Sequence, residues 1–268
     1  MSDNWIYYPC QMGENRAFIY YNETAKEQLE NQPELNHCLR IEIDLKHPRE
    51  DGLPQNHEHE ALYAYEDLLV EKLAPINGIY TGRVTVSGLR YFYCYLNPGY
   101  IGDNSHSARD KIPTLLKELQ LKTGYKATHL LELDLERDHF HNALSPTDND
   151  WQVINDIKVL EALEKHGDQP NIPREIDHWI FFKTPEFREN YQQWARNSGF
   201  QVRTSFESED KTEPHPYTLQ IYKTACTTLE EISHITLTLK HKADEMDAEY
   251  DGWETPVKKS PNTNIEKT

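Results

Sequence analysis

Cysteine, glycine and long apolar stretches are all scarce in this chain of 268 residues. Its four cysteines, Cys10, Cys38, Cys94 and Cys226, form no C-x-x-C pair, so we read them as reduced thiols and expect no zinc site built on them. The 11 glycines are not clustered, which argues against a phosphate-cradling loop. No apolar run reaches the ~20 residues of a membrane helix, and the first residues lack the basic and apolar regions of a signal peptide. We therefore expect a cytoplasmic protein.

Positively charged residues are also scarce. The chain has 28 Lys and Arg residues and 45 Asp and Glu residues, which gives a net charge of −17. A general nucleic-acid binder needs cations that displace counterions from phosphates, and an anionic membrane surface attracts basic proteins. The sequence therefore predicts neither direct nucleic-acid binding nor membrane docking. The charge is consistent with a basic partner, but an acidic surface that only keeps the protein soluble is the more common explanation.

The chain is predicted to form two domains that carry similar charge. The first has 14 Lys and Arg against 22 Asp and Glu, giving −8, and the remainder has 14 against 23, giving −9. A turn-rich stretch at 145–150 separates them. We expect an N-terminal α+β domain at 1–147, a second domain at 148–258 and a flexible tail at 259–268.

Hydrophobic periodicity in the second domain predicts a leading helix and then strand, helix, strand, strand, helix and strand. Thr184 and Pro185 begin the first of the two inner helices and Gly199 ends it, while Thr228 to Glu231 forms a capping box for the second. The predicted strands are residues 178–183, 200–206, 217–223 and 250–257.

The first domain shows the same order after a short hairpin at 5–8 and 17–21. A tight turn at Ser87-Gly88 joins its two middle strands. The predicted elements are strand 38–45, helix 58–74, strands 79–86 and 89–96, helix 110–122 and strand 127–135. The predicted fold class is thus α+β, with two ferredoxin-like βαββαβ sandwiches in tandem.

Catalytic motifs are missing, since the chain has no G-x-S-x-G, no P-loop and no H-E-x-x-H. Two histidine pairs, His57/His59 and His139/His141, leave open a metal-dependent or small-molecule enzyme as an alternative function. The pattern of each pair favours a solvated surface over a metal site. We predict no catalytic residue, no metal and no cofactor.

A second alternative concerns Tyr91, Tyr93 and Tyr95, which alternate along one predicted strand. Exposed aromatic side chains on a central strand of such a sheet can stack on RNA bases. An ordinary cross-strand aromatic ladder explains the same pattern.

The most unusual local run is Glu249-Tyr250-Asp251-Gly252-Trp253-Glu254. Tyrosine and tryptophan are enriched where protein partners bury them, and glycine permits a bulge between them. An edge strand that tucks Trp253 into the core is the competing interpretation.

This run also carries a family resemblance. Together with the aromatic strand Trp179–Phe182 and the joint at 197–200, it makes residues 150–258 resemble the regulator of ribonuclease E activity B, also called the ribonuclease E inhibitor. The first domain resembles an uncharacterised bacterial domain of the DUF695 type. That second resemblance rests on residues 5–21, 52–54, 80–83 and 88–93.

The resemblance implies a non-enzymatic regulator that binds an RNA-degrading endonuclease outside its catalytic centre. It implies a protein partner such as ribonuclease E or its basic scaffold region. Tyr250, Asp251, Gly252, Trp253 and Glu254 are the predicted partner-binding residues.

Overall fold

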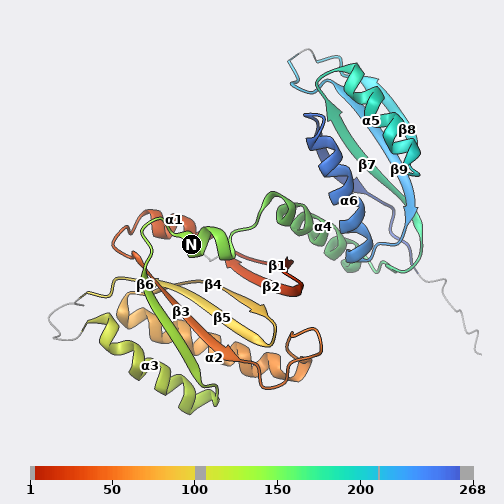
Figure 1. Ribbon diagram of the computed structural model, residues 1–268. Helices are drawn as coiled ribbons and strands as arrows, with labels where there is room; N and C mark the ends of the chain where they lie inside the picture. Colours follow the sequence, from red (N-terminus) through yellow and green to blue (C-terminus); the bar gives the residue numbers. More distant parts are fainter. Residues whose placement is uncertain (1–3, 100–106, 211, 260–268) are drawn as a thin grey trace, which may run out of the picture. The chain divides into compact units, whose positions relative to one another are not determined.

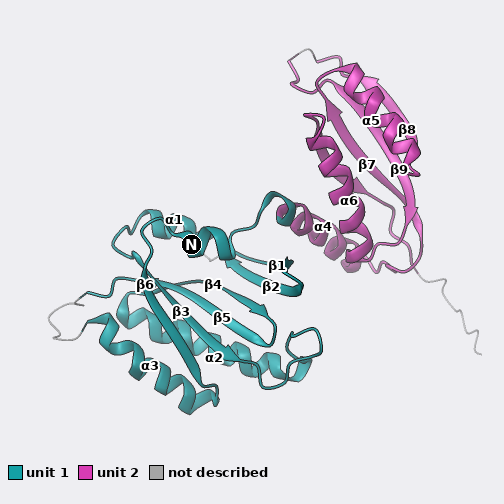
Figure 2. Ribbon diagram, viewed as in Figure 1, with its two compact units in different colours: residues 1–150 teal, residues 151–268 magenta. Residues whose placement is uncertain are grey.

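The computed structural model describes residues 4–99, 107–210 and 212–259 of the chain (Figure 1). The chain divides into two compact units, which we call unit 1 (residues 1–150) and unit 2 (residues 151–268) (Figure 2). Each unit is a mixed α+β structure with one antiparallel sheet and its own hydrophobic core.

The sheet of unit 1 has six strands in the order β1-β2-β4-β5-β3-β6. Helices α2 and α3 pack on one of its faces, over a core formed by β3, β4 and β5 (Figure 1). The strands are β1 (Trp5–Met12), β2 (Asn15–Asn22), β3 (His37–Asp44), β4 (Ile79–Val86), β5 (Leu89–Leu96) and β6 (Ala127–Leu133). The helices are α1 (Thr24–Glu30), α2 (His59–Leu73), α3 (Ala108–Thr123), the 3-10 helices η1 (Asn56–Glu58) and η2 (Ala74–Ile76), and the π-helix η3 (Phe140–Leu144).

Local sequence signals explain several of these boundaries. The Ser107 side chain accepts a hydrogen bond from the Asp110 N–H in a capping box that begins α3, and Gly124 ends the helix in the left-handed conformation. Ser87 and Gly88 both have positive φ, at 52° and 80°, as a two-residue type I′ hairpin requires. The tight turn predicted there is confirmed.

The N-terminal hairpin is longer than the short one expected, and it pairs with β4 to widen the sheet. Gly82 makes this pairing possible, because a Cβ atom there would lie 2.4 Å from the backbone oxygen of Tyr20. Two short helices were not predicted. Helix α1 and the π-helix η3 each bury only two side chains, which is too few for a periodic signal.

Unit 2 contains a four-stranded sheet in the order β10-β7-β9-β8. Its two inner helices begin as predicted, with the hydroxyls of Thr184 and Thr228 capping their first turns. Its elements are α4 (Asp148–Lys165), β7 (Arg174–Phe182), α5 (Pro185–Asn197), β8 (Gln201–Glu207), β9 (Tyr217–Ala225), α6 (Leu229–Asp244) and β10 (Glu249–Glu254). The predicted strand at 250–257 is shorter and ends at Glu254. The predicted tail lies largely outside the described residues.

Candidate functional site

The Tyr-Asp-Gly-Trp run forms β10, an edge strand of the sheet in unit 2. The register against β7 shifts between Tyr250 and Gly252, which is a β-bulge, and Gly252 has a φ of 131°. Few residues other than glycine adopt this φ, so Gly252 allows the bulge. Beyond it, Trp253 enters the core and is only 8% exposed.

Trp253 is anchored by a polar contact inside unit 2. Its indole N–H donates a hydrogen bond to Oδ1 of Asp156 on α4 at 3.0 Å. The other carboxylate oxygen of Asp156 accepts a bond from the Thr236 hydroxyl at 2.7 Å. Burial raises the pKa of Asp156, and these donors oppose the rise because they favour the carboxylate.

The side chain of Tyr250 also makes a polar contact inside unit 2. Its hydroxyl lies 2.9 Å from Nδ1 of His178 on β7. Burial lowers the pKa of His178 to about 3, so the imidazole is neutral at physiological pH. Two of the five predicted binding residues therefore have side chains that hold β10 in place, while Asp251 and Glu254 are exposed.

The sheet of unit 2 has one face covered by helices and one that no described helix of the unit covers. Ile176, Ile180 and Phe182 of β7 point into the core with α5 and α6. Because side chains alternate along a strand, the residues between them point the other way. The residues of the other strands that pair beside them point the same way. We call this surface the open face. It consists of Glu175, Asp177, Trp179 and Phe181 of β7, Tyr222 of β9, Phe206 of β8, and Glu249 and Glu254 of β10.

Aromatic side chains occupy the middle of the open face. Trp179, Phe181 and Tyr222 are half-buried, and Phe206 is 49% exposed. Large flat side chains with accessible surface are typical of protein-binding sites, where they supply contact area at low entropic cost. The open face was not predicted, although the alternation of 175–182 contains the signal.

Carboxylates border these rings. Glu175 and Asp177 form ion pairs with Arg203, whose guanidinium lies 4.1 Å from the centre of the Tyr222 ring. Glu254 of the open face and Asp251, in the adjoining bulge of β10, form no ion pair with any described cation. The open face thus presents aromatic rings beside uncompensated negative charge.

The predicted histidine pairs do not converge. His57 is exposed and its ring packs against His47, whereas His59 is half-buried near Tyr63. His141 contacts Phe140 edge to face, away from the contacts of His139.

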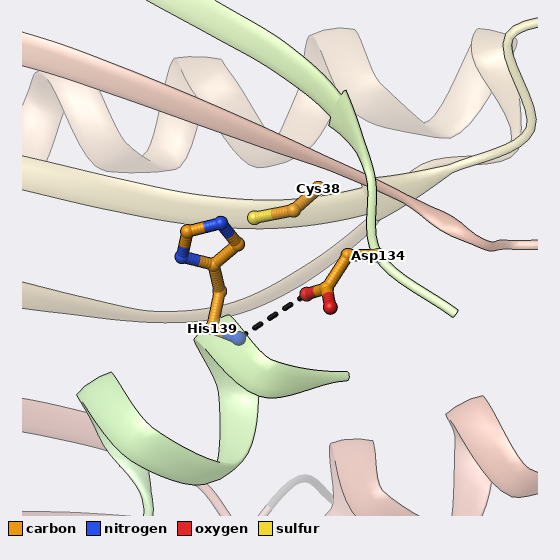
Figure 3. A group of neighbouring side chains, drawn as sticks. All are labelled: Cys38, Asp134 and His139. Carbon is orange, nitrogen blue, oxygen red and sulfur yellow. Dashed lines mark hydrogen bonds between the residues drawn. The ribbon is translucent and has the colours of Figure 1, made fainter. Parts of the chain in front are cut away.

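Among the described residues, one group has the spacing of metal ligands, and it lies in unit 1. The ligand atoms of Cys38, Asp134 and His139 all lie within 4.8 Å of one another (Figure 3). Asp134 already accepts hydrogen bonds from the Tyr95 hydroxyl at 2.5 Å and from the backbone N–H groups of Asp138 and His139 at 2.8 and 3.2 Å. Burial raises the pKa of Cys38 to about 12. A protonated thiol and an engaged carboxylate fit a turn-stabilising cluster better than a metal centre.

The structure corrects the idea of an RNA-stacking surface on β5. Tyr93 is 7% exposed and Tyr95 is fully buried, because the segment that ends in η3 covers them. Only Tyr91 is half-exposed. Two of the three rings therefore offer no face to a base.

Two parts of the chain match known protein families. Residues 154–255 match the family described as "Regulator of ribonuclease activity B". Residues 3–122 match the family of unknown function DUF695. Both predicted resemblances are confirmed, and each covers less than half of the chain.

No curated protein matches the chain. Two solved structures are similar at low level. A protein described as a glycine cleavage system transcriptional repressor is 8% identical, with 82% of this chain and 98% of that chain covered and a TM-score of 0.25. An unknown protein from Galdieria sulphuraria is 9% identical, with 83% and 99% covered and a TM-score of 0.23. Among the described residues, no helix has the length and apolarity needed to cross a membrane.

Proposed function

We propose that this chain is a non-enzymatic, cytoplasmic regulator that binds an RNA-degrading endonuclease of the ribonuclease E kind. The family match over 154–255 supports the regulatory role. In this proposal residues 148–258 form the binding domain and residues 1–147 form a second domain with its own role. The order β10-β7-β9-β8 and the order β4-β5-β3-β6 within unit 1 support two ferredoxin-like sandwiches.

The observation that carries the proposal is the open face of unit 2. Its half-buried rings suit the planar guanidinium of arginine, which stacks on aromatic faces. The free carboxylates of Glu254 on this face and of Asp251 in the adjoining bulge suit the same cation by charge. We therefore assign the open face to an arginine-containing segment of the endonuclease. Attraction to a unit of net negative charge would speed the encounter.

The first experiment uses the full chain and purified ribonuclease E, with cleavage of a fluorescent RNA and binding calorimetry as readouts. The test variant is D251K/E254K, which reverses two exposed charges on β10. The matched control is E164K/E189K, which makes the same change on α4 and α5, where both residues are exposed.

The proposal expects stoichiometric chain to slow RNA cleavage, and expects D251K/E254K to bind at least about tenfold more weakly, equivalent to about 1.4 kcal/mol. The control should bind like the wild type. Equal loss in both variants would indicate a general charge effect rather than this face. An unchanged cleavage rate and no binding heat with the wild type would refute the proposal.

A further inference from the structure

Unit 1 contains a cavity of about 920 Å³ that the proposed function does not use. The hairpin β1–β2 continues the sheet beyond β4 (Figure 1), and helix α2 stands beside it on the same face. Strands β4 and β5 supply the floor. The volume lies within the usual range for small-molecule sites, about 300–1,000 Å³.

Two arginines lie side by side in the floor of this cavity. Arg83 on β4 pairs with Phe92, and Arg90 on β5 pairs with Thr85, so both side chains share the face that carries α2. Arg83 forms an ion pair with Glu66 of α2, and both side chains are almost fully buried. The Tyr80 hydroxyl donates to the same carboxylate at 2.8 Å. Glu66 is therefore fully engaged.

Arg90 has no such partner. It is 3% exposed, and its Nε donates to the Thr85 hydroxyl at 3.0 Å. Its buried Nη1 finds no hydrogen-bond partner among the described residues. The other acidic lining residue, Asp67, is exposed on α2. Because an unpaired buried cation is costly, its presence in a cavity wall indicates an anion that binds there.

The cavity has aromatic walls. Trp5 stacks on Tyr20 with ring centres 4.6 Å apart, and Tyr7 stacks on Phe18 at 5.1 Å. The Tyr7 ring of the hairpin is 51% exposed. Tyr63 of α2, which also lines the cavity, is 50% exposed. Such rings favour a ligand with a flat body that covers them.

We propose that unit 1 binds a small organic molecule in which a carboxylate or phosphate group is joined to a flat ring. The anionic group pairs with the guanidinium of Arg90. The ring packs between Tyr63 and the aromatic side chains of the hairpin. Arg83 completes the cationic floor but remains committed to Glu66. This proposal is independent of endonuclease binding, because none of its residues lies in unit 2.

Calorimetry on the full chain tests it with defined probes. Adenosine 5′-monophosphate and 4-hydroxybenzoate combine a ring with a phosphate and a carboxylate, respectively. Adenosine and inorganic phosphate each supply only one part. We expect at least one of the two combined probes to bind at least about tenfold more tightly than adenosine and than inorganic phosphate, and the preferred probe identifies the anionic group.

Two variants locate the site. Arg90→Met removes the buried cation while retaining an apolar side chain, and Tyr63→Ala removes an exposed ring whose loss leaves the core intact. Each should weaken binding of the preferred probe at least about tenfold. Arg196→Met and Phe187→Ala, on exposed positions of α5 in unit 2, are the matched controls.

A stability readout separates a binding role from a structural one. If Arg90 serves to bind an anion and not to stabilise the fold, Arg90→Met should leave the melting temperature of the ligand-free chain unchanged or higher. The proposal is overturned if neither combined probe binds at millimolar concentration or if both site variants bind like the controls. It is also overturned if the monophosphate is the preferred probe but adenosine binds as tightly.

Discussion

The indole N–H of Trp253 and the Oδ1 atom of Asp156 meet at 3.0 Å inside unit 2, although 97 positions separate them in the chain. The contact joins the edge strand β10 to helix α4. The side chain of Trp253 therefore stabilises unit 2. The partner-binding role proposed for the same segment then falls to its exposed carboxylates.

We expect Trp253→Phe to destabilise unit 2 by about 1–3 kcal/mol, because the substitution removes buried ring volume and leaves Asp156 without one donor. Urea unfolding followed by tryptophan fluorescence measures this. Trp179→Phe, a half-buried position on the open face, is the control and should cost less than about 1 kcal/mol. Equal effects at the two positions would show that the hydrogen bond and burial of Trp253 contribute little.

His178 predicts a pH dependence of stability. Its pKa in the folded state is about 3 because the ring is buried, whereas in the unfolded chain it is close to the ordinary value of about 6.5. Below about pH 6.5 the unfolded state therefore binds the extra proton, and the free energy of unfolding falls until about pH 3. Between pH 7 and pH 5 this residue alone should remove about 2 kcal/mol.

The variant His178→Gln isolates that contribution, since every other titrating group stays in place. Its free energy of unfolding should depend less steeply on pH than that of the wild type across the pH 5–7 window. Parallel curves for the two proteins would mean that the pKa of His178 is nearly the same in the folded and unfolded states, as it would be for a ring accessible to water.

Much of the fold could be predicted because most elements are long and periodic. The tight turn at Ser87-Gly88 and the cap at Thr184 are local signals, and local backbone geometry decides them. The widened sheet of unit 1 was not predictable in this way. It depends on the close approach of the Gly82 backbone to Tyr20, which is possible only without a Cβ atom. The hydrophobic pattern of the sequence contains no information on such an approach.

The candidate sites were harder to predict because they depend on burial and on long-range contacts. The sequence singled out Tyr93 and Tyr95 as a possible stacking surface, but the segment ending in η3 covers both rings. Arg90 lies in the segment 88–93 that carries the DUF695 resemblance, but the sequence does not show that its side chain is buried and leaves Nη1 without a partner. The open face is an intermediate case, since strict alternation in β7 separates Trp179 and Phe181 from the core residues.

Gly82 itself predicts a large local effect. Gly82→Ala places a Cβ atom against the Tyr20 backbone oxygen, so the pairing between β2 and β4 must loosen. We expect faster amide hydrogen exchange in residues 15–22 and a loss of about 2–4 kcal/mol from unit 1. Gly13→Ala is the control, because its φ of 63° is strained for alanine but nothing lies within 4 Å. A control as damaging as Gly82→Ala would mean that backbone φ, not the close approach, dominates.

The cluster around Cys38 predicts a difference in thiol reactivity. Burial raises the pKa of Cys38 to about 12, and Cys94 is raised in the same direction and fully buried, so both remain protonated thiols at pH 8. Because the thiolate is the reactive form, iodoacetamide should modify half-exposed Cys226 in the folded chain and spare Cys38 and Cys94. Denatured chain, in which all four cysteines should react, is the control, read by peptide mass spectrometry. Rapid labelling of Cys38 that stoichiometric Zn²⁺ suppresses would instead reveal a thiolate poised for metal beside Asp134 and His139.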